Sequence, residues 1–150
     1  MAITQAMVTS FKVEILDGYH NFGTAPVRAT GVADVFKLAL YTSSATLSAT
    51  TTAYTTSNEV ATAGGYTAGG NTLTISQVPT STTTTAWLDF ADSVWTAATI
   101  TANGAMIYNS TQSNKCVAIL AFGGDKSSTA GDFTVIFPTA DSTNAIIRIA

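Results

Sequence analysis

Apolar and polar positions alternate along most of the chain, which predicts short β-strands. From Val35 to Tyr41, the residues Phe36, Leu38 and Leu40 recur at a period of two, the period of a strand with one buried face. Similar runs follow at short spacing, separated by Gly, Asn, Ser and Asp residues that favour turns. These runs are NTLTISQV, TAWLDFAD, GAMIYNS, KCVAILAF, FTVIF and NAIIRI. Because no helices recur between them, we expect one mainly β domain over residues 1–150, with an antiparallel β-sandwich or jelly-roll-like fold.

Only the N-terminus departs from the strand pattern. Met7, Phe11 and Ile15 recur at a spacing of four, which gives a single apolar stripe on a helix. This stripe predicts one short N-terminal helix over residues 4–17, with Gly18 as its stop. We expect the helix to cover one end of the sheet, and its stripe is also a candidate contact with a partner.

A long segment poor in charge, residues 42–71, interrupts the strand pattern. It is rich in Thr, Ser, Ala and Gly, and its sizeable apolar residues are Tyr54, Val60 and Tyr66. Connections of this length are usually functional or disordered, and recurring aromatics with so little charge are not typical of disorder. We therefore expect an ordered arm that packs on its own sheet or adds a strand to a neighbouring chain, with Tyr41, Tyr54 and Tyr66 as contact residues.

The composition limits the classes of partner. Charged residues make up 10% of the chain and the net charge is -3, whereas an average soluble domain has about 25% charged residues. The Lys and Arg residues are scattered, so no basic patch for nucleic acid is expected. No apolar window approaches the ~20 residues of a membrane span, and the N-terminus lacks the pattern of a signal peptide. A surface of hydroxyls and small residues desolvates at low cost, which favours contacts with other protein copies.

Candidate chemistry is sparse. Cys116 is the only cysteine, and in the apolar run KCVAILAF it is expected to be a small buried hydrophobe. His20 has no metal-ligand partners at suitable spacing, which favours a hydrogen-bonded loop histidine. Most acids fall in or beside turns, where they accept backbone hydrogen bonds; a glycan-active enzyme would depend on Asp89 or Asp92. GGDKSSTAGD is expected to be a turn and lacks the acid spacing of calcium loops. The sequence thus predicts no enzyme, with no catalytic residue, metal ligand or cofactor.

Six segments, taken in order along nearly the whole chain, carry a resemblance to a known family. The segments are FKLALYTSSATL (36–47), Asn58 to Val60, GYTAGG (65–70), GAMIYN (104–109), FGGDK (122–126) and NAIIRI (144–149). Together they resemble a widespread family of small virion structural proteins of tailed bacteriophages. Ala121 departs from the pattern, because an acidic residue is expected before FGGDK.

This resemblance implies a virion protein, made in the host cytoplasm and located on the outer surface of the particle. One role is a capsid decoration (cement) protein, which would bind the major capsid protein and neighbouring copies of itself as a homo-oligomer. The alternative is a tail-associated protein, such as a fibre, collar or adaptor, which would bind a tail partner or a host glycan. For a glycan, Trp87, Trp95, Tyr54 and Tyr66 are the candidate aromatic platform, although aromatics in strands more often belong to the core.

Overall fold

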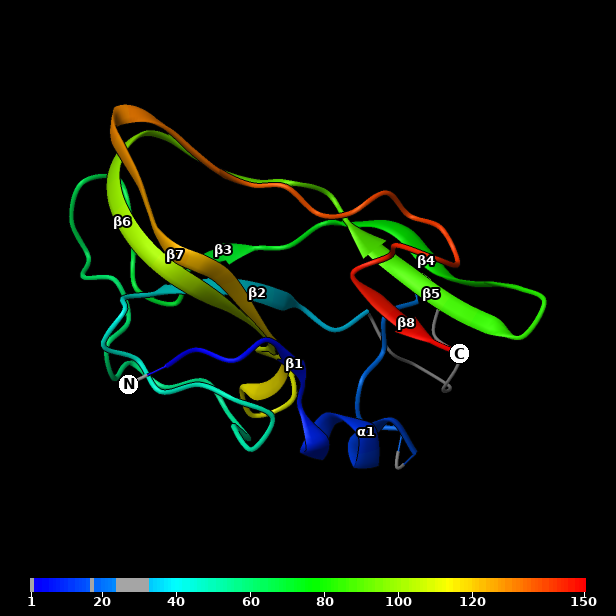
Figure 1. The fold of residues 1–150 in the computed structure, drawn as a ribbon. Coiled ribbons are helices and arrows are strands. Elements are labelled where there is room, and N and C mark those ends of the chain that lie inside the picture. Colours follow the sequence, from blue (N-terminus) through cyan, green and yellow to red (C-terminus); the bar gives the residue numbers. More distant parts are fainter. Residues whose placement is uncertain (1, 17, 24–32) are drawn as a thin grey trace.

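Strands dominate the computed structural model of the chain, which describes residues 2–16, 18–23 and 33–150 (Figure 1). It is mainly β, with 51% strand and 5% helix, as the sequence predicts. The elements are β1 (Ala6–Met7), α1 (Thr9–Leu16), β2 (Phe36–Tyr41), β3 (Asn71–Thr72), β4 (Ile75–Thr82), β5 (Thr85–Phe90), β6 (Ser93–Asn109), β7 (Lys115–Val135) and β8 (Ile147–Ile149).

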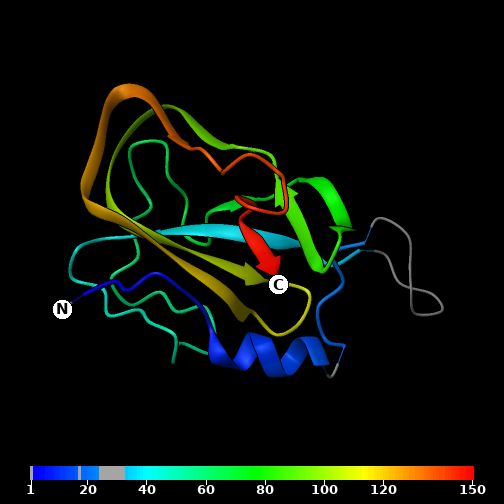
Figure 2. The ribbon, with the colours of Figure 1, turned by 45° about the vertical axis from the view of Figure 1, so that its right-hand side comes forward.

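The strands form two antiparallel sheets. The larger sheet has the order β1-β7-β6-β2-β3, and the smaller has the order β4-β5-β8. β2 pairs with β6 only at residues 104–109, whereas β6 and β7 pair along nearly their whole length. Residues 93–103 and 122–135 therefore leave the sheet as a two-stranded β6–β7 ribbon, which curves back above it (Figure 1, Figure 2).

β7 continues through a segment that the sequence predicts to be a turn. GGDKSSTAGD lies within β7, and its residues pair with β6, for example Lys126 with Ala102 and Ser128 with Ile100. Gly123, Gly124 and Ala130 have positive φ angles of 72°, 144° and 48°, so the strand bends without ending. The turn prediction is wrong because the long partner strand β6 supplies the ladder for residues whose local preference is weak.

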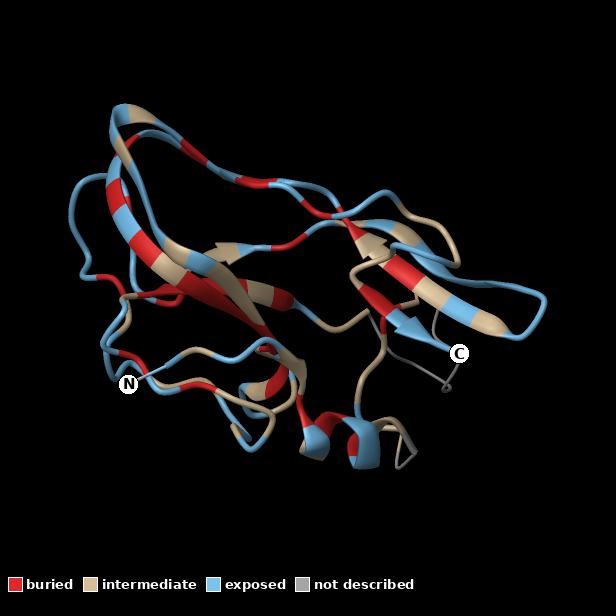
Figure 3. Ribbon diagram, in the orientation of Figure 1, coloured by how far each residue is buried: buried red, intermediate tan, exposed pale blue. Residues whose placement is uncertain are grey.

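The core lies where β2, β6 and β7 run side by side (Figure 3). The apolar run of KCVAILAF is buried from Cys116 to Ile119, as its continuous hydrophobicity predicts. Aromatic rings connect this core to the smaller sheet: Phe36 of β2 stacks on Phe22 at 4.2 Å between centroids, and it lies 5.9 Å from Phe90 of β5. The two sheets thus share one core.

The N-terminal helix is shorter than predicted. It begins at Thr9, not at residue 4, because Ala6 and Met7 form β1 and pair with Ile119 and Ala118 of β7. Strand pairing at this edge satisfies backbone groups that a first helical turn would leave unpaired. The predicted stop is confirmed: Gly18, with a φ of 71°, donates to Ile15 O at 3.0 Å while Tyr19 N donates to Glu14 O at 2.9 Å, the pattern of a Schellman cap.

The segment of residues 42–70 between β2 and β3, here called the excursion, packs on its own sheet. Val60 N donates to Leu40 O at 2.9 Å, and Thr99 N of β6 donates to Gly64 O at 2.7 Å. Its buried side chains belong to the same core as those of β2. Of the two expected arrangements, packing on its own sheet is confirmed, because Val60 and Tyr66 are buried within the chain itself. A contact of this segment with a neighbouring chain stays a prediction.

Candidate functional site

The structure divides the six predicted contact residues into two groups. Phe11, Tyr41 and Tyr66 are buried in the core, so these side chains present no surface to a partner, and their expected contact role is corrected. The other three, Met7, Ile15 and Tyr54, are partly buried and pack against the core from outside.

Glu59 holds the excursion in place and is the residue that the sequence analysis missed. Its Oε2 accepts from the Tyr54 hydroxyl, and its Oε1 accepts from the Tyr66 hydroxyl and from Gly69 N, each at 2.6 Å. Burial and the hydrogen bond to this carboxylate raise the pKa of Tyr54 and of Tyr66, so both remain neutral donors. Glu59 is the only charged residue in this part of the sequence, and that isolation is the signal that could have identified it.

Tyr108 of β6 supports the same cluster from the sheet side. Its hydroxyl donates to Gly69 O at 2.8 Å, and its ring stacks on Tyr54 at 4.5 Å between centroids. Burial raises the pKa of Tyr108 to about 12. The tyrosines around Glu59 therefore serve to hold the chain together.

A second polar cluster joins α1 to the end of the β6–β7 hairpin. The fully buried His20 side chain donates from Nε2 to Glu14 Oε2 at 2.7 Å, and Lys115 Nζ donates to Glu14 Oε1 at 2.6 Å. His20 Nδ1 accepts from the Asn109 amide at 3.1 Å, and that amide also donates to Asp34 at 2.7 Å. This confirms the prediction of a hydrogen-bonded loop histidine.

The charges in this cluster are set by competition between burial and pairing. Burial lowers the pKa of His20, and this effect exceeds the opposing attraction of Glu14. Burial also raises the pKa of Glu14, but the hydrogen bonds from Lys115 and His20 together outweigh it, so the net pKa lies below the ordinary value. The cluster thus contains a neutral histidine between an ion pair and a neutral amide.

Several acids accept backbone hydrogen bonds, as the sequence predicts, although Asp132 does so from within β7 and not from a turn. The backbone acceptors are Asp92 for Phe137 N, Asp132 for Ala97 N, and Asp141 for Thr143 N and Asn144 N. Asp89 differs: its Oδ2 accepts from Ser76 at 3.1 Å, its Oδ1 is buried with no hydrogen-bond partner, and burial raises its pKa. Within residues 2–16, 18–23 and 33–150, the structure brings together no group of three or more His, Cys, Asp and Glu residues suited to a metal ion.

The structure separates the aromatic residues of the candidate platform and buries the cysteine. Trp95 and Tyr66 are buried, with ring centroids 5.9 Å apart, whereas Trp87 lies on β5 in the other sheet. The four aromatic residues therefore do not share one exposed face. Cys116 is buried as predicted, and burial raises the pKa of its thiol to about 12.

One candidate contact surface is a groove between α1 and β8, here called the α1–β8 groove. It has a volume of about 500 Å³ and is lined by Met7, Lys12, Ile15, Arg148, Ile149 and Ala150. Ile15 and Ile149 also line a smaller apolar cavity of about 150 Å³ beside Phe11 and Phe22. The groove therefore combines apolar walls with two exposed cationic side chains, and it contains two of the predicted contact residues.

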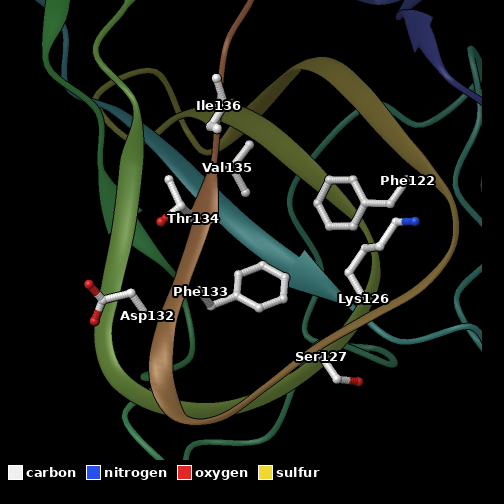
Figure 4. Close-up of a pocket in the computed structure, with 8 residues that line it drawn as sticks. All are labelled: Phe122, Lys126, Ser127, Asp132, Phe133, Thr134, Val135 and Ile136. Atoms are coloured by element: carbon white, nitrogen blue, oxygen red, sulfur yellow. The ribbon is translucent and has the colours of Figure 1, made fainter.

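A second candidate surface, here called the β7 hollow, lies inside the curve of the β6–β7 ribbon (Figure 4). It has a volume of about 510 Å³ and is lined by Phe122, Lys126, Ser127, Asp132, Phe133, Thr134, Val135 and Ile136. Phe122 and Phe133 approach to 6.4 Å between ring centroids, and Ile136 is 75% exposed. This surface is open, mainly apolar, and carries one charge of each sign.

Comparison with known proteins gives no match to a family model, to a curated protein or to a solved structure. In the part of the chain that the structure describes, no helix is long and apolar enough to cross a membrane.

Proposed function

We propose that the protein is a structural protein of a bacteriophage virion that decorates the capsid, binds the major capsid subunits and stabilises the head. The resemblance of six ordered segments to small virion proteins supports this role. The composition supports it as well, because a surface of low charge and many hydroxyls loses little solvation when it is covered. The proposed role is non-enzymatic and requires no cofactor.

The observation that carries the proposal is the α1–β8 groove. Met7 and Ile15 supply apolar walls, while Lys12 and Arg148 are exposed at the same groove of a chain with a net charge of -3. Apolar contact supplies affinity, and charges of one sign select and orient a partner of the opposite sign. The groove therefore fits an extended segment of a shell protein that carries apolar side chains flanked by carboxylates.

The first experiment locates the chain on the particle. The purified protein is added to undecorated expanded capsids, and its copy number on native virions is measured by quantitative mass spectrometry and electron microscopy. Decoration predicts copies on the order of hundreds, because capsid symmetry repeats the same contact many times. About a dozen copies, confined to the tail fraction, would support the tail-associated alternative instead. Absence of the chain from purified virions would overturn both.

Groove variants test the contact itself. Lys12→Glu combined with Arg148→Glu reverses both charges and is expected to lower capsid occupancy at least tenfold at low salt, where Coulomb attraction is least screened. Lys12→Arg combined with Arg148→Lys keeps both charges and is the matched control, expected to bind like the wild type. Equal binding by the two double variants would show that the groove is not the capsid contact.

A further inference from the structure

The β7 hollow exists because one strand folds back on itself. Phe122 and Ile136 line the same hollow, although a straight strand would place residues this far apart in sequence about 45 Å from each other. Figure 4 shows residues 132–136 on one side of the hollow and Phe122 and Lys126 on the other. The bend lies between them and includes Ala130, whose φ is 48°.

The two edges of the curved ribbon differ in how they are covered. On the β6 side, the excursion lies against the ribbon: Thr99 N donates to Gly64 O at 2.7 Å, and Tyr66 lies beside Trp95. On the β7 side, β1 pairs only with Ala118 and Ile119. From residue 121 to residue 135, β6 is the only strand beside β7 in the described part of the chain. The β6 edge of the ribbon is thus partly covered by the excursion, whereas the β7 edge is open.

An open strand edge offers unpaired backbone groups, which another strand can bind. Here the edge borders the β7 hollow, so the side chains of an added strand would have an apolar surface to cover. Ile136, Lys126 and Asp132 are all exposed at this hollow. A strand that binds here must match both the curvature and the side chains of this edge.

The positions of four side chains match a second copy of the same strand. Lys126 and Asp132 each lie three positions from Thr129, and Phe122 and Ile136 each lie seven positions from it. We infer that two copies of the chain pair antiparallel along β7 about a twofold axis at Thr129. Lys126 then faces the partner's Asp132, and Phe122 faces the partner's Ile136. One register satisfies both the charged pair and the apolar pair.

Curvature also favours a second copy over an unrelated strand. The edge bends at Ala130 and has positive φ angles at Gly123 and Gly124, so a straight strand cannot follow it. A twofold axis at the bend places an identical curve alongside, as in any interface that uses the same patch on both subunits. A strip of this length and ~10 Å width buries about 500 Å² per copy, at the low end for specific interfaces. The dimer is therefore expected to dissociate on dilution.

The register is tested by a cysteine on the proposed axis. Residues opposite each other in antiparallel strands have Cα atoms about 4.5–5.5 Å apart, within the range of a disulfide. Thr129→Cys is thus expected to form a disulfide-linked dimer under mild oxidation, seen on a non-reducing gel. Thr84→Cys, in the exposed turn between β4 and β5, is the control and should form no disulfide-linked dimer on the same gel. Cys116 is buried and does not interfere.

The side-chain pairs are tested by exchange of charge. Lys126→Asp and Asp132→Lys each place like charges opposite each other in a homodimer, so each is expected to associate at least tenfold more weakly in analytical ultracentrifugation. A mixture of the two variants restores both pairs and is expected to give a heterodimer. A folding defect at Asp132, which also accepts from Ala97 N, would not be repaired by mixing.

The apolar pair has a matched control. Ile136→Asp is expected to weaken the dimer, whereas Val13→Asp on α1, which is also exposed at 55%, should not. The inference is overturned if the wild type stays monomeric up to about 1 mM, a concentration that corresponds to about 4 kcal/mol of binding free energy. It is also overturned if Thr129→Cys crosslinks no faster than Thr84→Cys, or if a mixture of Lys126→Asp and Asp132→Lys forms no heterodimer. All measurements use the purified chain, so they are independent of the proposed capsid role.

Discussion

Replacement of Glu59 by alanine should loosen the excursion from the sheet. The carboxylate of Glu59 accepts three hydrogen bonds of 2.6 Å, from two tyrosine hydroxyls and one backbone N–H. Hydrogen bonds to a charged group contribute about 1.5–3 kcal/mol each. Glu59 is only partly buried, so water can hydrogen-bond to some of the donors that lose their acceptor. We therefore expect Glu59→Ala to lower the free energy of unfolding by about 3–6 kcal/mol.

Such a loss is a large part of the ~5–15 kcal/mol that stabilises a typical domain. The assay is equilibrium unfolding in urea, followed by tyrosine and tryptophan fluorescence, together with amide exchange at Gly69 and Val60. Exchange at these two amides should accelerate more than exchange in the paired centres of β6 and β7.

Two variants provide the controls. Glu59→Gln keeps the size and an acceptor oxygen but removes the charge, so it should cost about 1–2 kcal/mol. Asp141→Ala removes a carboxylate that bonds only within its own exposed turn and should leave the urea midpoint close to that of the wild type. If Glu59→Ala costs less than about 1 kcal/mol, or no more than Glu59→Gln, the role given to this residue is wrong.

Three further predictions concern stability and reactivity. Gly70→Ala should destabilise the fold by more than about 3 kcal/mol, because the added Cβ would overlap the carbonyl of Leu38. Gly123 has a similar positive φ but open space around it, so Gly123→Ala is the control and should lower the urea midpoint less. Equal losses in the two variants would contradict the steric explanation. The chain's only histidine, His20, has a lowered pKa in the folded state, so as the pH falls the unfolded chain takes up the proton before the folded chain does. The contribution of His20 to the free energy of unfolding should therefore be complete above pH 6.5, the ordinary pKa, and be lost as the pH falls from there toward the folded pKa. His20→Gln should abolish this fall in a plot of urea midpoint against pH. A separate fall below pH 4.5 should remain, because the lowered pKa of Glu14 makes the folded state lose stability when that carboxylate is protonated. Finally, the buried Cys116 thiol, with its pKa raised to about 12, should react with a disulfide reagent at pH 8 at least 100-fold more slowly in buffer than in urea; comparable rates would mean that the thiol is accessible.

The candidate surfaces were only partly predictable from the sequence. The spacing of Met7 and Ile15 identified two residues of the α1–β8 groove, but the same spacing also selected Phe11, which is buried. A stripe of apolar residues indicates which side of an element is covered, not whether the chain itself or a partner covers it. The β7 hollow had no signal of its own, because its lining residues meet only when β7 bends back.

Local patterns by themselves determined the strand at residues 36–41, the buried run around Cys116 and the end of α1 at Gly18. Each depends on side-chain periodicity or on backbone freedom within a few residues, and both can be read from adjacent positions. Tertiary structure alone decided that Ala6 and Met7 extend along β7, that the excursion folds onto its own sheet through Glu59, and that GGDKSSTAGD continues a strand. In each of these cases a hydrogen-bonding partner distant in sequence outweighs a weak local preference, because the backbone groups and the carboxylate must be satisfied where the fold places them.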